Sequence, residues 1–450
     1  MPTLIYTIAR TTFLESVRQP IYFIMIGLCA VFQIINTASL GYSLGYSDTS
    51  EVSGDNKMLL DVGLATILFC GTLLAGFIAT AALSREIEKK TVLTIVSKPV
   101  PRPIVVIGKY VGAAAAIFIA TIAMIVFLQL GLRHGIMSTA RDEVDMPVVV
   151  FSFAAVALAI GIGVWGNFFY GWHFTQTASL LLCPLIFFAW LMVLFISKKW
   201  EWQPPDHDIK PQILLASVCL ILALLLMTAV AIAASSRLGQ VMTIVICFGV
   251  FVMGLLSNYL IGKRAFTNTV VGQIVAAAPE KEVMTSLRSA GDIYNITLKT
   301  VPTAALPPGR SFYYGPNPNG FDLAVPSFAR FNGDANADGL LLDSSPSALV
   351  ITAVNSRQIT IRNIGGRPIQ VARPPQPGDF VFVEPTAINP VAAIAWGILP
   401  NMQFFWLTDA VTQNRPVPAT HILRVAAYSG IQIVAFLSLA VLLFQKRDVG

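Results

Sequence analysis

Charged residues are scarce in this 450-residue sequence. Asp, Glu, Lys and Arg make up 12% of it, about half of their usual share in a soluble domain, whereas hydrophobic residues make up 55%. The mean hydropathy is +0.70. A chain of this length is then too apolar for a soluble globular protein, so lipid is its expected solvent.

Cysteine and histidine are also rare. The five cysteines all fall inside apolar runs without a CxxC pair, which excludes a disulfide framework and a cysteine metal motif. The four histidines are far apart, and no HExxH motif occurs. These absences argue against a membrane enzyme. For the small cluster of Asp206, His207 and Asp208 we expect a solvated loop rather than a metal site.

A basic face is missing as well, although the net charge is +6. The Lys and Arg residues are scattered among the polar loops and form no continuous patch, so we expect no nucleic-acid partner. We interpret these residues as topology signals, because basic residues beside membrane spans collect on the cytoplasmic side.

Long apolar runs recur from Ile21 to Leu443. A helix needs about 20 mostly apolar residues to cross the hydrocarbon layer. The sequence therefore predicts an all-α polytopic membrane protein of about eight transmembrane helices, at residues 21–40, 58–83, 104–131, 147–166, 175–197, 211–234, 238–261 and 420–444. The pair within 147–197 is the least regular, because several glycines interrupt it.

Basic residues flank these predicted spans mainly on one face. With eight spans, this face receives Arg10 and Arg18; Arg85, Lys89, Lys90, Lys98 and Arg102; Arg237; and Lys446 and Arg447. Smaller groups, Arg133 among them, fall on the opposite face. The balance favours a multi-pass protein of the plasma (inner) membrane with both termini cytoplasmic.

Residues 1–19 place apolar side chains at helical spacing opposite Arg10 and Arg18. This pattern is typical of an amphipathic helix on the membrane surface, and an early turn of the first span explains it equally well. Pro20 favours a break between the two. A cleaved signal peptide is disfavoured, because the following apolar run has the length of a span.

The composition changes after the transmembrane region at 20–261. Between 262 and 387, Gly, Pro, Asn and Asp are common, and alternating stretches such as 358–364 are typical of strands. We expect a small, mainly β extracytoplasmic insertion there. Helices in the outer interface at 388–419 then precede the last span and cytoplasmic tail at 420–450.

One local pattern inside this insertion resembles half of a calcium loop. Asp334, Asn336 and Asp338 have the spacing of the first EF-hand ligands, followed by Gly339. Ser345 stands where that loop needs a bidentate carboxylate. An Asp/Asn/Gly turn is therefore the preferred interpretation, with calcium as a weak candidate and no other metal expected.

The most informative segment is the charged loop at 84–103, between the second and third predicted spans. A short amphipathic helix there would turn its charged residues to water and its apolar residues to the bilayer, which suits docking into a groove on a soluble partner. Pro99 and its neighbouring prolines then end it before the third span begins. An ordinary charged interfacial loop explains the same residues.

This segment resembles the loop of the type 2 ABC exporter permeases (ABC-2-type transporter permeases). The features that carry the resemblance are Glu86, Glu88, Thr91, the run from Val96 to Arg102 that includes Pro99, and Gly108 with Lys109; Lys89 belongs to the same loop. In that family the loop forms a coupling helix on the nucleotide-binding subunit, so the resemblance implies an ATPase-coupling role for these residues. The stretches 232–254 and 399–418 also resemble parts of this family. The family's usual core has six spans, so one further hairpin is expected here.

No GxxxxGK[ST] motif occurs, so the chain has no Walker A loop for ATP. The resemblance implies that ATP is bound by a separate ABC ATPase subunit, that two permeases pair as a homodimer or heterodimer, and that this chain holds no cofactor. The alternatives are an ABC-coupled complex for envelope assembly or force transmission, and a secondary transporter. The near absence of charges within the predicted spans argues against the secondary transporter.

Overall fold

The computed structural model of the chain describes eleven stretches of residues: 2–40, 51–84, 101–136, 143–205, 208–280, 291–304, 306–321, 323–325, 348–364, 374–407 and 419–445. The chain divides into two compact units. The first, the membrane unit, comprises Met1–Leu255 and Pro400–Gly450, and the second comprises Leu256–Leu399.

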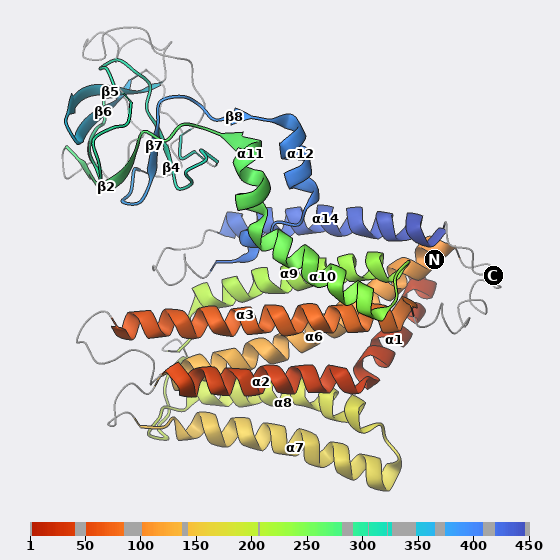
Figure 1. Ribbon diagram of the computed structural model, residues 1–450. Helices are drawn as coiled ribbons and strands as arrows, with labels where there is room; N and C mark the ends of the chain where they lie inside the picture. The colour runs from red at the N-terminus through yellow and green to blue at the C-terminus, as the bar shows by residue number, and fades with distance from the viewer. Residues whose placement is uncertain are drawn as a thin grey trace. The chain divides into compact units, whose positions relative to one another are not determined.

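Eight helices in the described residues are long and apolar enough to cross a membrane, which confirms the predicted fold class. They are α2 (Pro20–Leu40), α3 (Glu51–Ala79), α6 (Arg102–His134), α7 (Met146–Tyr170), α8 (Phe174–Phe195), α9 (Pro211–Ser235), α10 (Gln240–Ser257) and α14 (Ala419–Gln445) (Figure 1). α3 ends in a π-helical turn, η1 (Thr80–Ser84). α10 continues through a second one, η3 (Asn258–Gly262), into the short α11 (Lys263–Ala265).

The helix boundaries follow from proline, glycine and capping residues. α1 (Pro2–Arg18) is separated from α2 at Gln19, next to the predicted break at Pro20, and α1 is not among the helices apolar enough to span. Proline occupies the first turn of α6, α7 and α9, where its missing N–H costs nothing. α6 ends at Gly135 and α7 at Gly171, both with positive φ.

The centre of the membrane unit is built by α3, α6 and α9, each with more than 60% of its span buried, whereas α7 and α14 are 22% buried. α6 contacts α2, α3, α8 and α9, while α7 packs almost entirely against α8 (Figure 1). We call the two ends of the bundle the Arg102 end and the Arg133 end, after the residues that begin and nearly end α6.

The glycines between residues 147 and 197 do not interrupt the helices. A Cβ on Gly163 would lie 3.1 Å from Phe174, and one on Gly166 would lie 2.3 Å from Trp172. Small residues at these positions therefore let α7 and α8 approach closely. The region consists of two long helices joined by a short turn.

The second unit contains an antiparallel six-stranded sheet with the order β4-β7-β2-β3-β6-β5. Its strands are β2 (Gly272–Pro279), β3 (Ile293–Leu298), β4 (Tyr313–Gly315), β5 (Ala348–Asn355), β6 (Gln358–Ile364) and β7 (Phe380–Phe382). A separate pair is formed by β1 (Phe266–Thr267) and β8 (Ala387–Ile388), after which α12 (Pro390–Ile398) begins.

The two edges of this sheet are joined by the residues just before β4. The amide of Phe312 donates to the carbonyl of Leu349 on β5, and the amide of Ile351 donates to the carbonyl of Arg310. β4 itself pairs with β7. The sheet is therefore closed around a core of aliphatic and aromatic side chains, and closure removes edge strands that would otherwise pair with other chains.

Candidate functional site

The predicted coupling residues divide into two groups. Glu86, Glu88, Lys89, Thr91 and Pro99 lie outside the described residues, so their role stays a prediction. Arg102, Gly108 and Lys109 lie in the first eight residues of α6. The structure thus describes the two helix ends that hold the segment, η1 before it and α6 after it.

Gly108 allows α1 to lie directly on α6. A Cβ on Gly108 would approach the Ile8 side chain to 2.9 Å, and one on Gly112 would approach the carbonyl oxygen of Ala9 to 2.4 Å. Two glycines four residues apart lie on the same face of a helix, where they form a groove for a neighbouring helix. The glycine of the predicted motif therefore serves helix packing.

Lys109 lies inside the protein, with 2% of its surface exposed. Its ammonium group donates a hydrogen bond to the carbonyl oxygen of Ala82 in η1. The last carbonyls of a helix lack partners in their own helix, and a cation satisfies both their hydrogen-bonding capacity and the helix dipole. Lys109 therefore joins the end of α3 to the start of α6, across the predicted coupling segment.

Two arginines attach the end of α14 to the same region. Arg102 Nη1 donates to the carbonyl of Gln445 at 2.7 Å, and Arg237 Nε donates to the carbonyl of Leu443 at 2.9 Å. Basic side chains on the last carbonyls of a helix stabilise its C-terminus. The basic residues at 102 and 237, which the topology argument placed on one face, thus meet at one end of the bundle.

The corner between α1 and α2 is held at this end as well. Arg18 Nε donates to Gln176 Oε1 at 2.7 Å, and Thr175 Oγ1 donates to the carbonyl of Arg18 at 2.6 Å. Both partners lie in the first turn of α8. Polar contacts at the Arg102 end therefore join α3 to α6, join α6 and the end of α9 to α14, and join α1 to α8.

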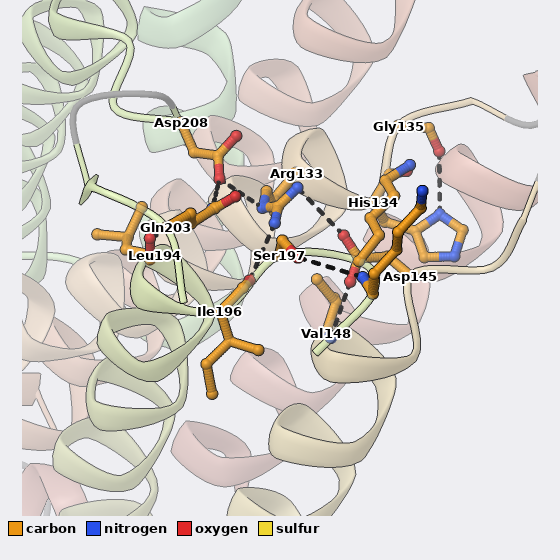
Figure 2. A network of polar contacts seen from close by, with 12 residues as sticks. Arg133, His134, Gly135, Asp145, Val148, Leu194, Ile196, Ser197, Gln203 and Asp208 are labelled. Carbon is orange, nitrogen blue, oxygen red and sulfur yellow. Dashed lines mark hydrogen bonds and ion pairs between the residues drawn. The ribbon is translucent and has the colours of Figure 1, made fainter. Parts of the chain in front are cut away.

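A second polar network lies at the Arg133 end (Figure 2). The guanidinium group of Arg133 meets two carboxylates, with Nε 2.9 Å from Asp208 Oδ2 and Nη1 3.4 Å from Asp145 Oδ2. Its Nη2 donates to the carbonyl of Ile196 at 3.1 Å. Asp145 is fully buried and caps α7 by accepting from the amide of Val148 at 3.3 Å. Arg133 therefore fastens α6 to the start of α7 and to both ends of the α8–α9 connection.

Sequence reasoning missed this network. Arg133 was interpreted only as a topology signal and Asp208 as part of a solvated loop. Asp206 and His207 lie outside the described residues, and the remainder of the chain that the structure describes holds no cluster of three potential metal ligands. The calcium candidates Asp334, Asn336 and Asp338 also lie outside it. A cavity of about 130 Å³ adjoins the network, lined in part by Gln129, Arg133 and Lys210.

Two amide side chains within the spans join neighbouring helices. Gln33 Nε2 donates to the carbonyl of Gly63 at 2.9 Å, and Asn36 Nδ2 donates to the carbonyl of Leu59 at 3.0 Å, so both connect α2 to α3. Asn167 closes the α7–α8 turn by donating to the carbonyl of Trp172. Hydrogen bonds between helices explain these residues without a polar translocation path.

Comparison with known families adds one match. Residues 6–165 match the family model described as "ABC-2 family transporter protein". No curated protein and no solved structure matches the chain. The matched range runs from α1 into α7, so it includes both helices that flank the predicted coupling segment, and the resemblance inferred for later stretches stays a prediction. This family is a membrane component of ABC transporters and not itself the ATPase. Residues 6–165 are therefore similar to an ABC-2 family transporter domain, in a chain whose described residues include eight helices long and apolar enough to cross a membrane.

Proposed function

We propose that the chain is the permease subunit of an ABC exporter driven by a separate ATPase subunit, which docks on the segment 84–103. The observation that carries this proposal is the ABC-2 family match over the part of the chain that contains the segment. Two permeases and two ATPases complete the transporter, in the plasma (inner) membrane with both termini cytoplasmic. ATP is bound by the partner, and this chain holds no cofactor.

The polar contacts at the Arg102 end support a mechanism. ATP-driven closure of two ATPases displaces the docked segment, which continues into η1 on one side and into α6 on the other. Lys109 joins α6 to η1, and Arg102 joins the start of α6 to the end of α14. Since α6 contacts α2, α3, α8 and α9, a shift of its first turns changes their packing. The ATPase can drive this change only if it interacts more favourably with one arrangement of the helices than with the other.

Charge reversal on the docking segment tests the proposal. In the variant Glu86→Lys with Glu88→Lys, the membrane-embedded helices are unchanged, and added positive charge on a cytoplasmic loop preserves the topology. We expect normal abundance in the membrane and at least tenfold less ATPase co-purified with the chain, because like charges facing each other at an interface cost several kcal/mol.

The matched control carries the same charge change at the opposite end of the bundle. Glu143 and Glu201 are both exposed near the Arg133 end, so Glu143→Lys with Glu201→Lys should leave ATPase association unchanged. Membrane abundance is measured for both variants. Equal association of the ATPase with the segment variant and with wild type contradicts docking at residues 84–103.

A further inference from the structure

A cavity of about 750 Å³ opens within the membrane unit, between α3, α10 and the segment that follows Pro400. Its walls are formed by Ala65, Leu68, Phe69, Phe251, Leu255, Gln403 and Trp406. Small-molecule sites typically measure about 300–1,000 Å³ and often lie between the helices of a bundle. The volume of the cavity therefore lies within the range of sites that bind small molecules.

The lining selects for hydrocarbon. Six of the seven lining residues are aliphatic or aromatic and none carries a charge. Phe248 extends the aromatic wall, because its ring lies 6.4 Å edge-to-face from Phe69 and 6.4 Å from Phe251. An ion or a sugar would lose its hydration here without finding charged partners, whereas an apolar chain gains by burying its surface.

The two polar lining residues lie together on one wall, in the segment after Pro400. Gln403 Nε2 donates to the carbonyl of Leu255 at 2.7 Å, which ties this wall to α10. Met402 is buried where a Cβ on Gly254 would approach it to 2.8 Å, so the wall is firmly packed. Trp406 adds an indole, a group that is apolar over its ring and polar at its N–H and that favours the membrane–water boundary.

The depth of the cavity matches one leaflet of a bilayer. Ala65 and Phe69 lie 7 and 11 residues from Met58, where the second candidate span begins. At about 1.5 Å per residue this is about 10–16 Å along the helix, up to about half of a 30 Å hydrocarbon layer. The apolar walls are thus level with acyl chains of the leaflet at the Arg133 end.

We propose that this cavity binds the hydrocarbon tail of an amphiphile taken from that leaflet, with the polar group of the ligand beside Gln403 and Trp406. As a statement about cargo class it rests on the proposed permease function. Binding itself does not require the ATPase, so the two proposals fail in distinguishable ways.

The test is photolabelling of the full-length chain, purified alone in lipid nanodiscs, with phosphatidylethanolamine that carries a diazirine in its acyl chain. Labelled positions are mapped by peptide mass spectrometry. We expect labelling to concentrate on the stretches 65–69 and 251–255. Ala65→Trp fills the cavity and should reduce this labelling at least fivefold, while Ala157→Trp, at an exposed alanine of α7, should leave it unchanged.

The thermal unfolding midpoint checks that each variant is folded, and Ala65→Phe replaces Ala65→Trp if the larger side chain prevents folding. Excess unlabelled palmitate and excess unlabelled phosphatidylethanolamine, added separately, distinguish a free fatty acid from a lipid as the source of the tail. Even labelling along all lipid-facing helices, with no loss in the cavity variant, overturns the proposal. Efficient disulfide crosslinking of Ala65→Cys between two copies also overturns it, because a second chain then covers the cavity.

Discussion

The ammonium group of Lys109 donates a hydrogen bond to the carbonyl oxygen of Ala82, so that α6 is joined to the π-helical end of α3. The two residues are 27 positions apart and enclose the segment predicted to contact the ATPase. A buried cation at this place joins the end of α3 to the start of α6, so the two helices form a hairpin with a fixed base. This contact gives Lys109 a positioning role behind the docking surface.

Replacing Lys109 should weaken the base of the hairpin. Lys109→Met keeps the length of the side chain but leaves the Ala82 carbonyl without its charged partner, and such bonds contribute about 1.5–3 kcal/mol. We expect a lower midpoint of thermal unfolding and ATP hydrolysis that is no longer coupled to transport. Lys210→Met, at an exposed lysine of the Arg133 end, is the control. A Lys109→Met protein with wild-type stability and coupling contradicts the positioning role.

Gly112 should tolerate no side chain. In Gly112→Ala the new Cβ lies 2.4 Å from the Ala9 carbonyl oxygen, so α1 must move away from α6. Overpacking of this kind costs about 1–3 kcal/mol, measurable as a drop in the thermal midpoint. Gly161→Ala has open space around its Cβ and should be neutral or slightly stabilising, because alanine favours a helix more than glycine does. Equal midpoints for the two variants refute the close packing of α1.

The Arg133 network predicts strong coupling between its members. Arg133→Met leaves the buried carboxylate of Asp145 without its cation, and loss of one partner of a buried pair costs about 3–5 kcal/mol. Lys199→Met, at an exposed lysine nearby, should cost almost nothing. Adding Asp145→Asn to Arg133→Met should recover part of the loss in a double-mutant cycle of unfolding midpoints. Additive losses would show that the two residues do not interact.

Topology reporters check the orientation. A reporter fused after Gly450 and one inserted near Lys89 should both be active on the cytoplasmic side, because the basic residues at the Arg102 end favour retention there. A reporter near Asp338, after seven spans, should be active on the opposite side. Cytoplasmic activity at Asp338 would contradict the arrangement of eight spans.

The helices could be predicted from the sequence because each span depends on local composition. All eight predicted ranges agree with long helices, since about 20 apolar residues suffice to define a span. Pro20 and Pro211 likewise affect only the helical turns in which they lie. The irregular glycines of the α7–α8 hairpin were harder to interpret, because Gly166 is explained only by its contact with Trp172.

The contacts of charged residues could not be predicted, because they depend on which helices become neighbours. Arg133 and Asp208 are 75 positions apart, and no local pattern relates them. Lys109 looked like the start of a span, yet its burial follows from the turn of α3 that faces it. Closure of the β sheet likewise depends on residues 309–312 meeting β5, which alternation within single strands does not specify.

The central claim, a permease driven by a separate ATPase, is tested most directly by comparing the chain purified alone with the chain purified together with its ATPase partner. ATP hydrolysis and transport are measured in liposomes, with and without an imposed proton gradient. Without a Walker A motif and with few charges in its spans, the lone chain should show neither ATP hydrolysis nor gradient-driven transport, and the complex should show ATP-dependent transport. Gradient-driven transport by the lone chain would contradict the account.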